Sequence, residues 1–71
     1  MKAYKNSKGH TMMVLKDNDG DYGVYMRKSD KEDMKPATSK YPHRATRKEA
    51  EEDLVAMVYR SREKTWKEVE V

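Results

Sequence analysis

Residues 46–65, TRKEAEEDLVAMVYRSREKT, are the stretch of this 71-residue chain that decides the fold. Thr46 and Glu49 have the spacing of a capping box, in which the threonine hydroxyl accepts a backbone N–H from one turn into the helix. Acidic residues fill the first turns and basic residues the last, which is the charge order that the helix macrodipole favours. The stretch therefore predicts one long C-terminal helix over residues 46–65.

The apolar residues of this helix form two neighbouring stripes at about 100° per residue. The first stripe holds Ala50, Leu54, Met57, Val58 and Ser61, and the second holds Val55, Tyr59, Arg62 and Trp66. We expect the first stripe to pack on a small sheet. The second is either core, which is the default for apolar residues at helical spacing, or an anchor for a protein partner or a second copy of the chain. In the latter case the interface residues are Val55, Tyr59 and Trp66.

Length and composition predict a single small domain over residues 1–71 with a thin core. The chain has no Ile or Phe, only two Leu and six Met, and methionine fills space without fixing it. It has no cysteine, which excludes disulfides, thiol nucleophiles and thiolate metal sites and fits a reducing compartment. We find no signal peptide or membrane-spanning run, so we expect a soluble cytoplasmic protein without a membrane partner.

Positive charge is concentrated in the first half of the chain. Residues 1–45 contain ten Lys or Arg against six Asp or Glu. Lys2, Lys5, Lys8 and Lys16 all precede the first acid, Asp17. We expect residues 1–9 to be a flexible basic arm, with Ala3 and Tyr4 able to add a short edge pairing. Such an arm either follows a polyanion or only increases solubility.

Two short stretches, TMMVLK at 11–16 and YGVYMRK at 22–28, predict the strands of a β-hairpin over residues 10–28. Asp17-Asn18-Asp19-Gly20 between them is typical of a type I turn whose glycine takes a positive φ. If Asp17 pairs with Asp21, Val14 faces Val24 and Met12 faces Met26, on the side that we expect to meet the helix. The other side then carries Thr11, Met13, Leu15, Gly23, Tyr25 and Arg27.

The remaining segments carry weaker signals. Residues 29–45 are expected to be a charged loop, with a candidate edge strand at 38–44 because Pro42 excludes a central position. Residues 66–71 are a tail that is either a frayed helix end, a last strand or disordered. The predicted fold class is α+β, a two- or three-stranded antiparallel sheet packed on one long helix.

The sequence contains no pattern typical of a metal site, a cofactor site or a catalytic site. Asp17, Asp19 and Asp21 have the spacing at which an EF-hand loop begins, but Tyr22 and Lys28 stand where that loop needs glycine and glutamate. No ligand spacing joins the two histidines, His10 and His43. A glycine-rich phosphate loop and a nucleophile elbow are both lacking. We therefore expect a protein that is not an enzyme and needs no cofactor.

A binding surface is the remaining functional candidate. Tyr25 and Arg27 on the outer side of the hairpin combine a stacking group with a forked donor, and a small sheet can place such side chains on base edges in a DNA major groove. The candidate nucleic-acid-binding residues are Lys5, Lys8, Tyr25, Arg27, Lys40 and Arg44. The alternative is that tyrosine and arginine are present only because they are good strand formers.

The order of these elements resembles the amino-terminal arm-type DNA-binding domains of phage and transposon tyrosine recombinases. The resemblance rests on three short motifs. They are the helix start Thr46-Arg47-Lys48-Glu49-Ala50, the turn and second strand Asp17-Asn18-Asp19-Gly20 and Tyr22-Gly23-Val24-Tyr25, and the segment Thr65-Trp66-Lys67-Glu68-Val69.

The resemblance implies a non-catalytic module of a mobile genetic element that reads duplex DNA with its sheet. Tyr25 and Arg27 would contact bases, and Lys40 and Arg44 would hold phosphates. The chain departs from the family pattern at residues 43–45, where the family usually has an aromatic residue, and in the length of the loop at 29–37. The chain is either a free-standing relative, a fragment, or an unrelated domain of the same layout.

Overall fold

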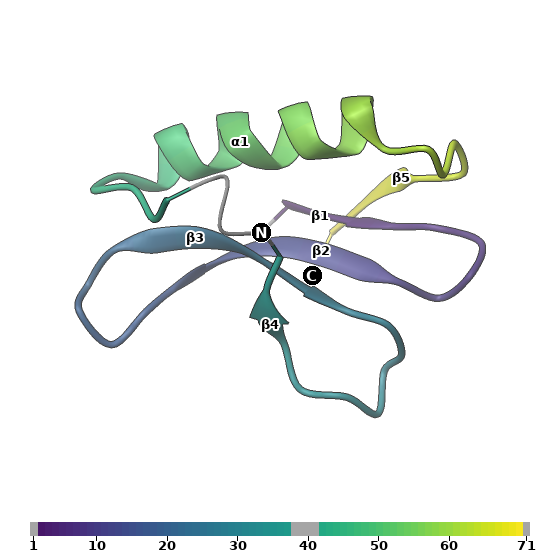
Figure 1. The fold of residues 1–71 in the computed structure, drawn as a ribbon, viewed down its shortest axis with the longest axis horizontal. Helices are drawn as coiled ribbons and strands as arrows, with labels where there is room; N and C mark the ends of the chain where they lie inside the picture. The colour runs from purple at the N-terminus through teal and green to yellow at the C-terminus, as the bar shows by residue number, and fades with distance from the viewer. Residues whose placement is uncertain (1, 38–41, 71) are drawn as a thin grey trace.

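The computed structural model of the chain describes residues 2–37 and 42–70, and in this part it has five strands and one helix. The elements are β1 (Lys2–Lys5), β2 (Thr11–Lys16), β3 (Tyr22–Arg27), β4 (Lys35–Pro36), α1 (Arg47–Arg60) and β5 (Lys67–Glu70). The strands form one antiparallel sheet in the order β4-β3-β2-β1-β5, and α1 lies along one face of it (Figure 1). The predicted α+β class is confirmed, but the sheet has more strands than the two or three predicted.

The β2–β3 hairpin has the predicted register, with Val14 opposite Val24 and Met12 opposite Met26. The Asp17 N–H donates to the Asp21 carbonyl at 2.7 Å, and Gly20 has a φ of 86°. The carboxylate of Asp17 accepts from two backbone N–H groups, those of Asp19 and Asp21. The turn therefore fixes the register, because its carboxylate replaces the backbone hydrogen bonds that a tight loop cannot make.

The prediction of a flexible arm is wrong for the described residues 2–9, because β1 is an interior strand between β2 and β5. Ala3 is fully buried. A turn at residues 6–10 returns the chain into β2, with the Asn6 side-chain oxygen accepting from the N–H groups of Lys8 and His10 at 3.0 Å. Gly9 completes this turn with a φ of 84°, a conformation that L side chains rarely adopt.

The helix begins where predicted and ends earlier. The Thr46 hydroxyl accepts from the Glu49 N–H at 3.3 Å and donates to the Glu49 carboxylate at 3.0 Å, so Thr46 is the N-cap. The predicted end at residue 65 is wrong, because Ser61 leaves the helical conformation with a ψ of 143°. The Ser61 hydroxyl instead accepts from the Glu63 N–H and from the Trp66 indole N–H. The chain turns there and returns as β5, so the tail is a last strand.

The edge strand on the other side of the sheet lies earlier than predicted. β4 consists of Lys35 and Pro36 and pairs with Tyr25 and Met26 of β3, whereas the candidate strand was placed at 38–44. Residues 38–41 of that candidate lie outside the described residues. Its end is present as a single bridge between Tyr22 and Arg44, which extends the pairing of β3 just before the helix.

The core lies between α1 and the faces of β2 and β3 that carry Val14 and Val24. The core residues are Met12, Val14, Val24, Ala50 and Leu54. Trp66, which follows the helix, packs against this core and widens it beyond the hairpin. The helix therefore covers only one face of the sheet. Within the described residues, no helix is long and apolar enough to cross a membrane.

Candidate nucleic-acid interface

The sheet face opposite α1 carries two rows of side chains that cross the strands. Directly opposed residues of antiparallel strands share a face, so the registers define both rows. One row is Lys67, Lys5, Thr11 and Arg27, and the next is Val69, Ala3, Met13, Tyr25 and Pro36. We call this surface the open face. It combines a row containing three cations with a mostly apolar row that includes one tyrosine.

Asp30, in the loop between β3 and β4, lies against the cationic row. Both of its carboxylate oxygens are 3.3 Å from Nζ of Lys5, and one is 3.6 Å from Nη2 of Arg27. The loop leaves the sheet on the side away from the helix, as Figure 1 shows. The Asp30 side chain is 65% exposed, so these are surface ion pairs of small energy.

His43 covers the end of the open face near the hairpin turn. Its ring lies so close over Gly23 that a Cβ there would be 2.3 Å from His43 Cδ2, and its ring centroid is 5.6 Å from that of Tyr25. Nδ1 of His43 is 2.6 Å from a carboxylate oxygen of Asp17. The glycine at 23 is therefore needed for space rather than for a positive φ.

The hydrogen bond from His43, followed by the one from the Asp21 N–H, lowers the pKa of Asp17 below its ordinary value of 3.8. A carboxylate whose pKa is lower in the folded state stabilises the fold above its unfolded pKa, and this stabilisation is lost as the pH falls through the folded value. The contact of Asp17 with His43 joins the hairpin turn to the open face. The stability that this contact gives therefore depends on pH.

We expect Asp17→Asn to lower the urea midpoint of unfolding at neutral pH, because an amide oxygen accepts the hydrogen bonds from His43 and from the turn N–H groups more weakly than a charged carboxylate does. The difference between wild type and variant should shrink as the pH is lowered below 3.8. Urea unfolding at a series of pH values measures this. A difference that stays constant down to the lowest pH would contradict an ionic role for Asp17.

The structure brings three of the six predicted nucleic-acid-binding residues together on the open face, namely Lys5, Tyr25 and Arg27. Arg44 lies elsewhere, because it pairs with Asp53 of α1 at 2.8 Å, a contact that raises the arginine pKa. Lys8 is in the β1–β2 turn, 3.6 Å from the Glu63 carboxylate. Lys8 and Arg44 are therefore not part of the open face, because Arg44 is held by Asp53 in the middle of α1 and Lys8 lies beside Glu63, just beyond the end of the helix. Lys40 lies outside the described residues.

The alternative protein-interaction stripe is divided in the structure. Val55 and Tyr59 are exposed on α1, at 48% and 84%. Trp66 is not helical, and it packs against the core with its indole N–H 3.0 Å from the Ser61 hydroxyl. The predicted stripe of three anchors is therefore wrong as one continuous surface, because the helix ends before Trp66.

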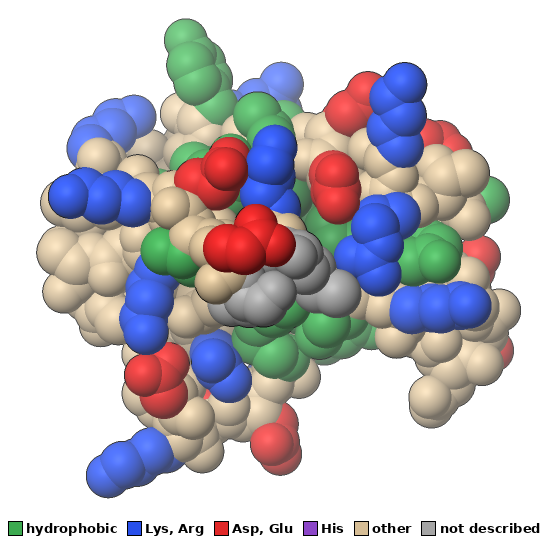
Figure 2. Space-filling view, turned by 180° about the vertical axis from the view of Figure 1, so that it is seen from behind, with side chains coloured by type: hydrophobic (Ala, Val, Ile, Leu, Met, Phe, Trp, Pro, Cys, Tyr) green, Lys and Arg blue, Asp and Glu red, His purple; other side chains and the backbone are tan. Residues whose placement is uncertain are grey.

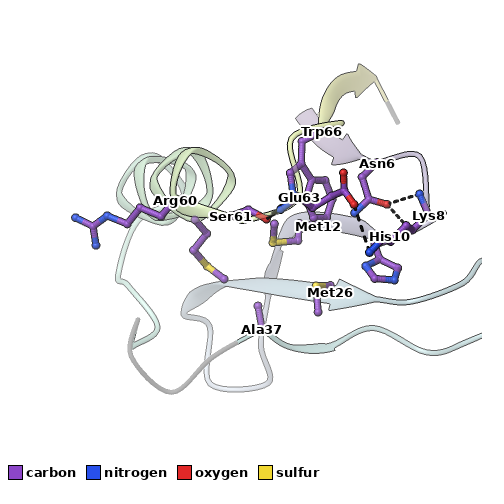
Figure 3. Close-up of a pocket in the computed structure, with 11 residues that line it drawn as sticks. Asn6, Lys8, His10, Met12, Met26, Ala37, Arg60, Ser61, Glu63 and Trp66 are labelled. Atoms are coloured by element: carbon purple, nitrogen blue, oxygen red, sulfur yellow. Dashed lines mark hydrogen bonds and ion pairs between the residues drawn. The ribbon is translucent and has the colours of Figure 1, made fainter.

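An apolar hollow of about 440 Å³ lies on the helix side of the sheet, near the end of α1. Met12 and Met26 line it from the sheet, and Trp66 closes one side (Figure 3). Asn6, Lys8 and His10 of the β1–β2 turn also line it. Its methionines and tryptophan belong to the core or pack against it, so the hollow is an irregularity of the thin core.

Charge over the rest of the surface is mixed. Figure 2, which views the molecule from behind, shows Lys and Arg side chains interspersed with Asp and Glu over that side. With a formal net charge of only +3, the whole protein attracts polyanions weakly. Any strong preference for an anion must therefore come from a local arrangement such as the cationic row.

Among residues 2–37 and 42–70, no group of three or more acidic, His or Cys side chains is placed to hold a metal ion. Comparison of the chain with protein-family models, with curated proteins and with solved structures finds no match. The open face therefore has to be interpreted from its own residues.

Sequence reasoning missed four residues of this surface: Thr11, Asp30, His43 and Lys67. Thr11 was assigned to the correct side of the hairpin, but nothing suggested that it stands between two cations. Lys67 reaches the surface only because β5 pairs with β1. Asp30 and His43 are brought there by loops, which have no periodicity from which a contact can be predicted.

Proposed function

We propose that this protein is a non-catalytic DNA-binding module, of the kind that mobile genetic elements use, and that its open face binds duplex DNA. The observation that carries the proposal is the cross-strand arrangement of Lys5, Arg27 and Tyr25 on the sheet face opposite α1. An antiparallel sheet can enter the major groove with such a face. The resemblance to recombinase arm-type domains supports the same reading.

Each side chain has a defined task in this proposal. Arg27 can donate a forked pair of hydrogen bonds to a guanine edge or to a phosphate, and Tyr25 can stack or pack against a thymine methyl. Lys5 contacts the phosphate backbone. A hollow of about 570 Å³ beside Lys5 and Lys67 is also lined by Lys64, which adds one more cation at this edge of the sheet.

Binding to duplex DNA should fall steeply as salt concentration rises, because each phosphate contact releases condensed counterions. With about three lysine or arginine contacts, the slope of log K against log salt should be roughly −3. Arg27→Ala should weaken binding roughly tenfold or more, while its melting temperature stays close to that of wild type, because the ion pair of Arg27 with the exposed Asp30 contributes little to stability. Fluorescence anisotropy and thermal denaturation measure the two effects.

Lys48→Ala is the matched control, because it removes the same charge from an exposed position on α1. It should change the affinity far less than Arg27→Ala. No binding at low salt, or binding without salt dependence, would refute the proposal. A large drop in the melting temperature of Arg27→Ala would instead give Arg27 a structural role.

A protein-interaction module remains the second candidate, and the observation in its favour is the exposure of Tyr59 and Val55. Tyr59 also borders a hollow of about 410 Å³ together with Val58 and Trp66. Tryptophan fluorescence that shifts to shorter wavelength on adding a protein partner, without any response to DNA, would favour this candidate.

A further inference from the structure

Two donors in the cationic row are buried without a hydrogen-bond partner. The hydroxyl of Thr11 is one of them, in a side chain that is only 4% exposed, and Nε of Arg27 is the other. Thr11 stands directly between Lys5 of β1 and Arg27 of β3 in the register. Buried polar atoms are normally paired, and an unpaired one destabilises the fold. The cationic row therefore holds two buried donors whose hydrogen bonds are unmade.

Asp30 places a negative charge beside this row but does not accept a hydrogen bond from all of its donors. Its carboxylate contacts the Lys5 ammonium and the Nη2 end of the Arg27 guanidinium, leaving both Nε and the Thr11 hydroxyl unpaired. Both a carboxylate and a phosphate match the guanidinium fork, but a carboxylate has two oxygens in one plane, whereas a phosphate group presents more oxygens over a wider angle and can accept from a further donor as well. The row has more donors than Asp30 can occupy.

Besides the ion pairs of Asp30 itself, two hydrogen bonds within residues 28–32 hold the loop that carries it. The Glu32 N–H donates to the Ser29 carbonyl at 3.2 Å, and the Glu32 carboxylate accepts from the Lys28 N–H at 3.0 Å. Asp30 itself is exposed. The carboxylate can therefore leave the row by a movement of its own side chain and loop, with no change in the core.

We infer that Lys5, Thr11 and Arg27 form a binding site for one phosphate group, and that Asp30 occupies this site in the free protein until a phosphate displaces it. The inference rests on the proposed function, because it identifies the bound phosphate as one of the DNA backbone. Free inorganic phosphate has the same chemistry. Asp30 then sets the affinity for DNA by competing with it.

Asp30→Asn tests the competition, because the amide keeps the shape of the side chain and removes its charge. In anisotropy titrations with a short duplex at several salt concentrations, this variant should bind roughly five times more tightly than wild type, because the phosphate no longer has to displace a carboxylate from a surface ion pair. Asp19→Asn is the matched control. It makes the same change in net charge at the hairpin turn, at the opposite end of β2 and β3, and should stay within about twofold of wild type.

Thr11→Val tests the hydroxyl. Valine has nearly the same shape, so the variant should melt at the same temperature as wild type or higher, because a buried unpaired hydroxyl is removed. Combined with Asp30→Asn, it should abolish most of the gain in affinity. A double variant that retains the full gain would exclude Thr11 from the site.

A second measurement separates this inference from the proposed function. Inorganic phosphate added to Asp30→Asn at constant ionic strength should shift the amide NMR signals of Thr11 and Arg27. Those shifts without DNA binding by any variant would support a site for free phosphate and refute the proposed function. DNA binding that is equal for Asp30→Asn and Asp19→Asn would overturn the inference and leave the proposed function intact. Absence of both DNA binding and phosphate shifts would refute both.

Discussion

Leu54→Ala should lower the free energy of unfolding by about 3 kcal/mol, within the range measured for buried leucines. Leu54 is 1% exposed and, with Val14, is one of the two largest fully buried side chains in the described part of the chain. A domain of this size has a total stability of roughly 4 to 10 kcal/mol. The substitution therefore removes a large share of it, and urea denaturation followed by circular dichroism measures the loss.

Val55→Ala is the matched control, one position further along α1. Its side chain is 48% exposed, so we expect a change below about 0.5 kcal/mol. A loss as large as that of Leu54→Ala would mean that Val55 is buried in solution. Unfolding that depends on protein concentration would then show that two copies of the chain contact each other through the exposed side of α1, as in the homodimer considered from the sequence.

Trp66→Ala should have the second largest effect, a loss of about 2 to 3 kcal/mol, which is below the usual range for a fully buried tryptophan because Trp66 is only half-buried. The indole ring packs against the core, and its N–H reaches the hydroxyl of Ser61 where the helix ends. Removing the ring opens the core beside Met12 and Met57 and also loosens the segment that leads into β5. Denaturation followed by circular dichroism measures the effect without relying on the missing fluorophore.

Trp66→Phe separates the two contributions of this side chain. Phenylalanine keeps most of the packing and loses only the hydrogen bond to Ser61, so we expect a loss of about 1 kcal/mol. If Trp66→Ala were instead as mild as a surface substitution, the ring would be free in solution. That result would favour the protein-interaction candidate over the DNA-binding one.

The parts of the fold that could be predicted from sequence are those fixed by neighbours in the chain. The register of Val14 with Val24 follows from the carboxylate of Asp17 and from Gly20, all within eleven residues. The start of α1 follows from Thr46 and Glu49, three positions apart. Such features depend on local hydrogen bonds and alternation, which the sequence displays directly.

The pairing of β1 with β5 could not be predicted, because its partners lie at opposite ends of the chain. Nothing local in Lys2–Lys5 indicates an interior strand, and the early helix end depends on Ser61 meeting Trp66. The residues of the open face likewise divide into those placed by local alternation and those placed by contacts between distant segments. Tyr25 and Arg27 share a face by simple alternation, while the contact of Asp30 with Lys5 depends on how a charged loop folds over the sheet.

The position of β1 between β2 and β5 also orders the events of folding. The hairpin and α1 can form the core from segments that are close in sequence, whereas Tyr4 and Glu68, which face each other across β1 and β5, are 64 positions apart. Closing so long a loop costs more chain entropy than closing the hairpin, and contacts of this kind slow folding. We therefore expect the strand that brings Lys67 to the open face to join the sheet last, so that the cationic row is completed only late in folding.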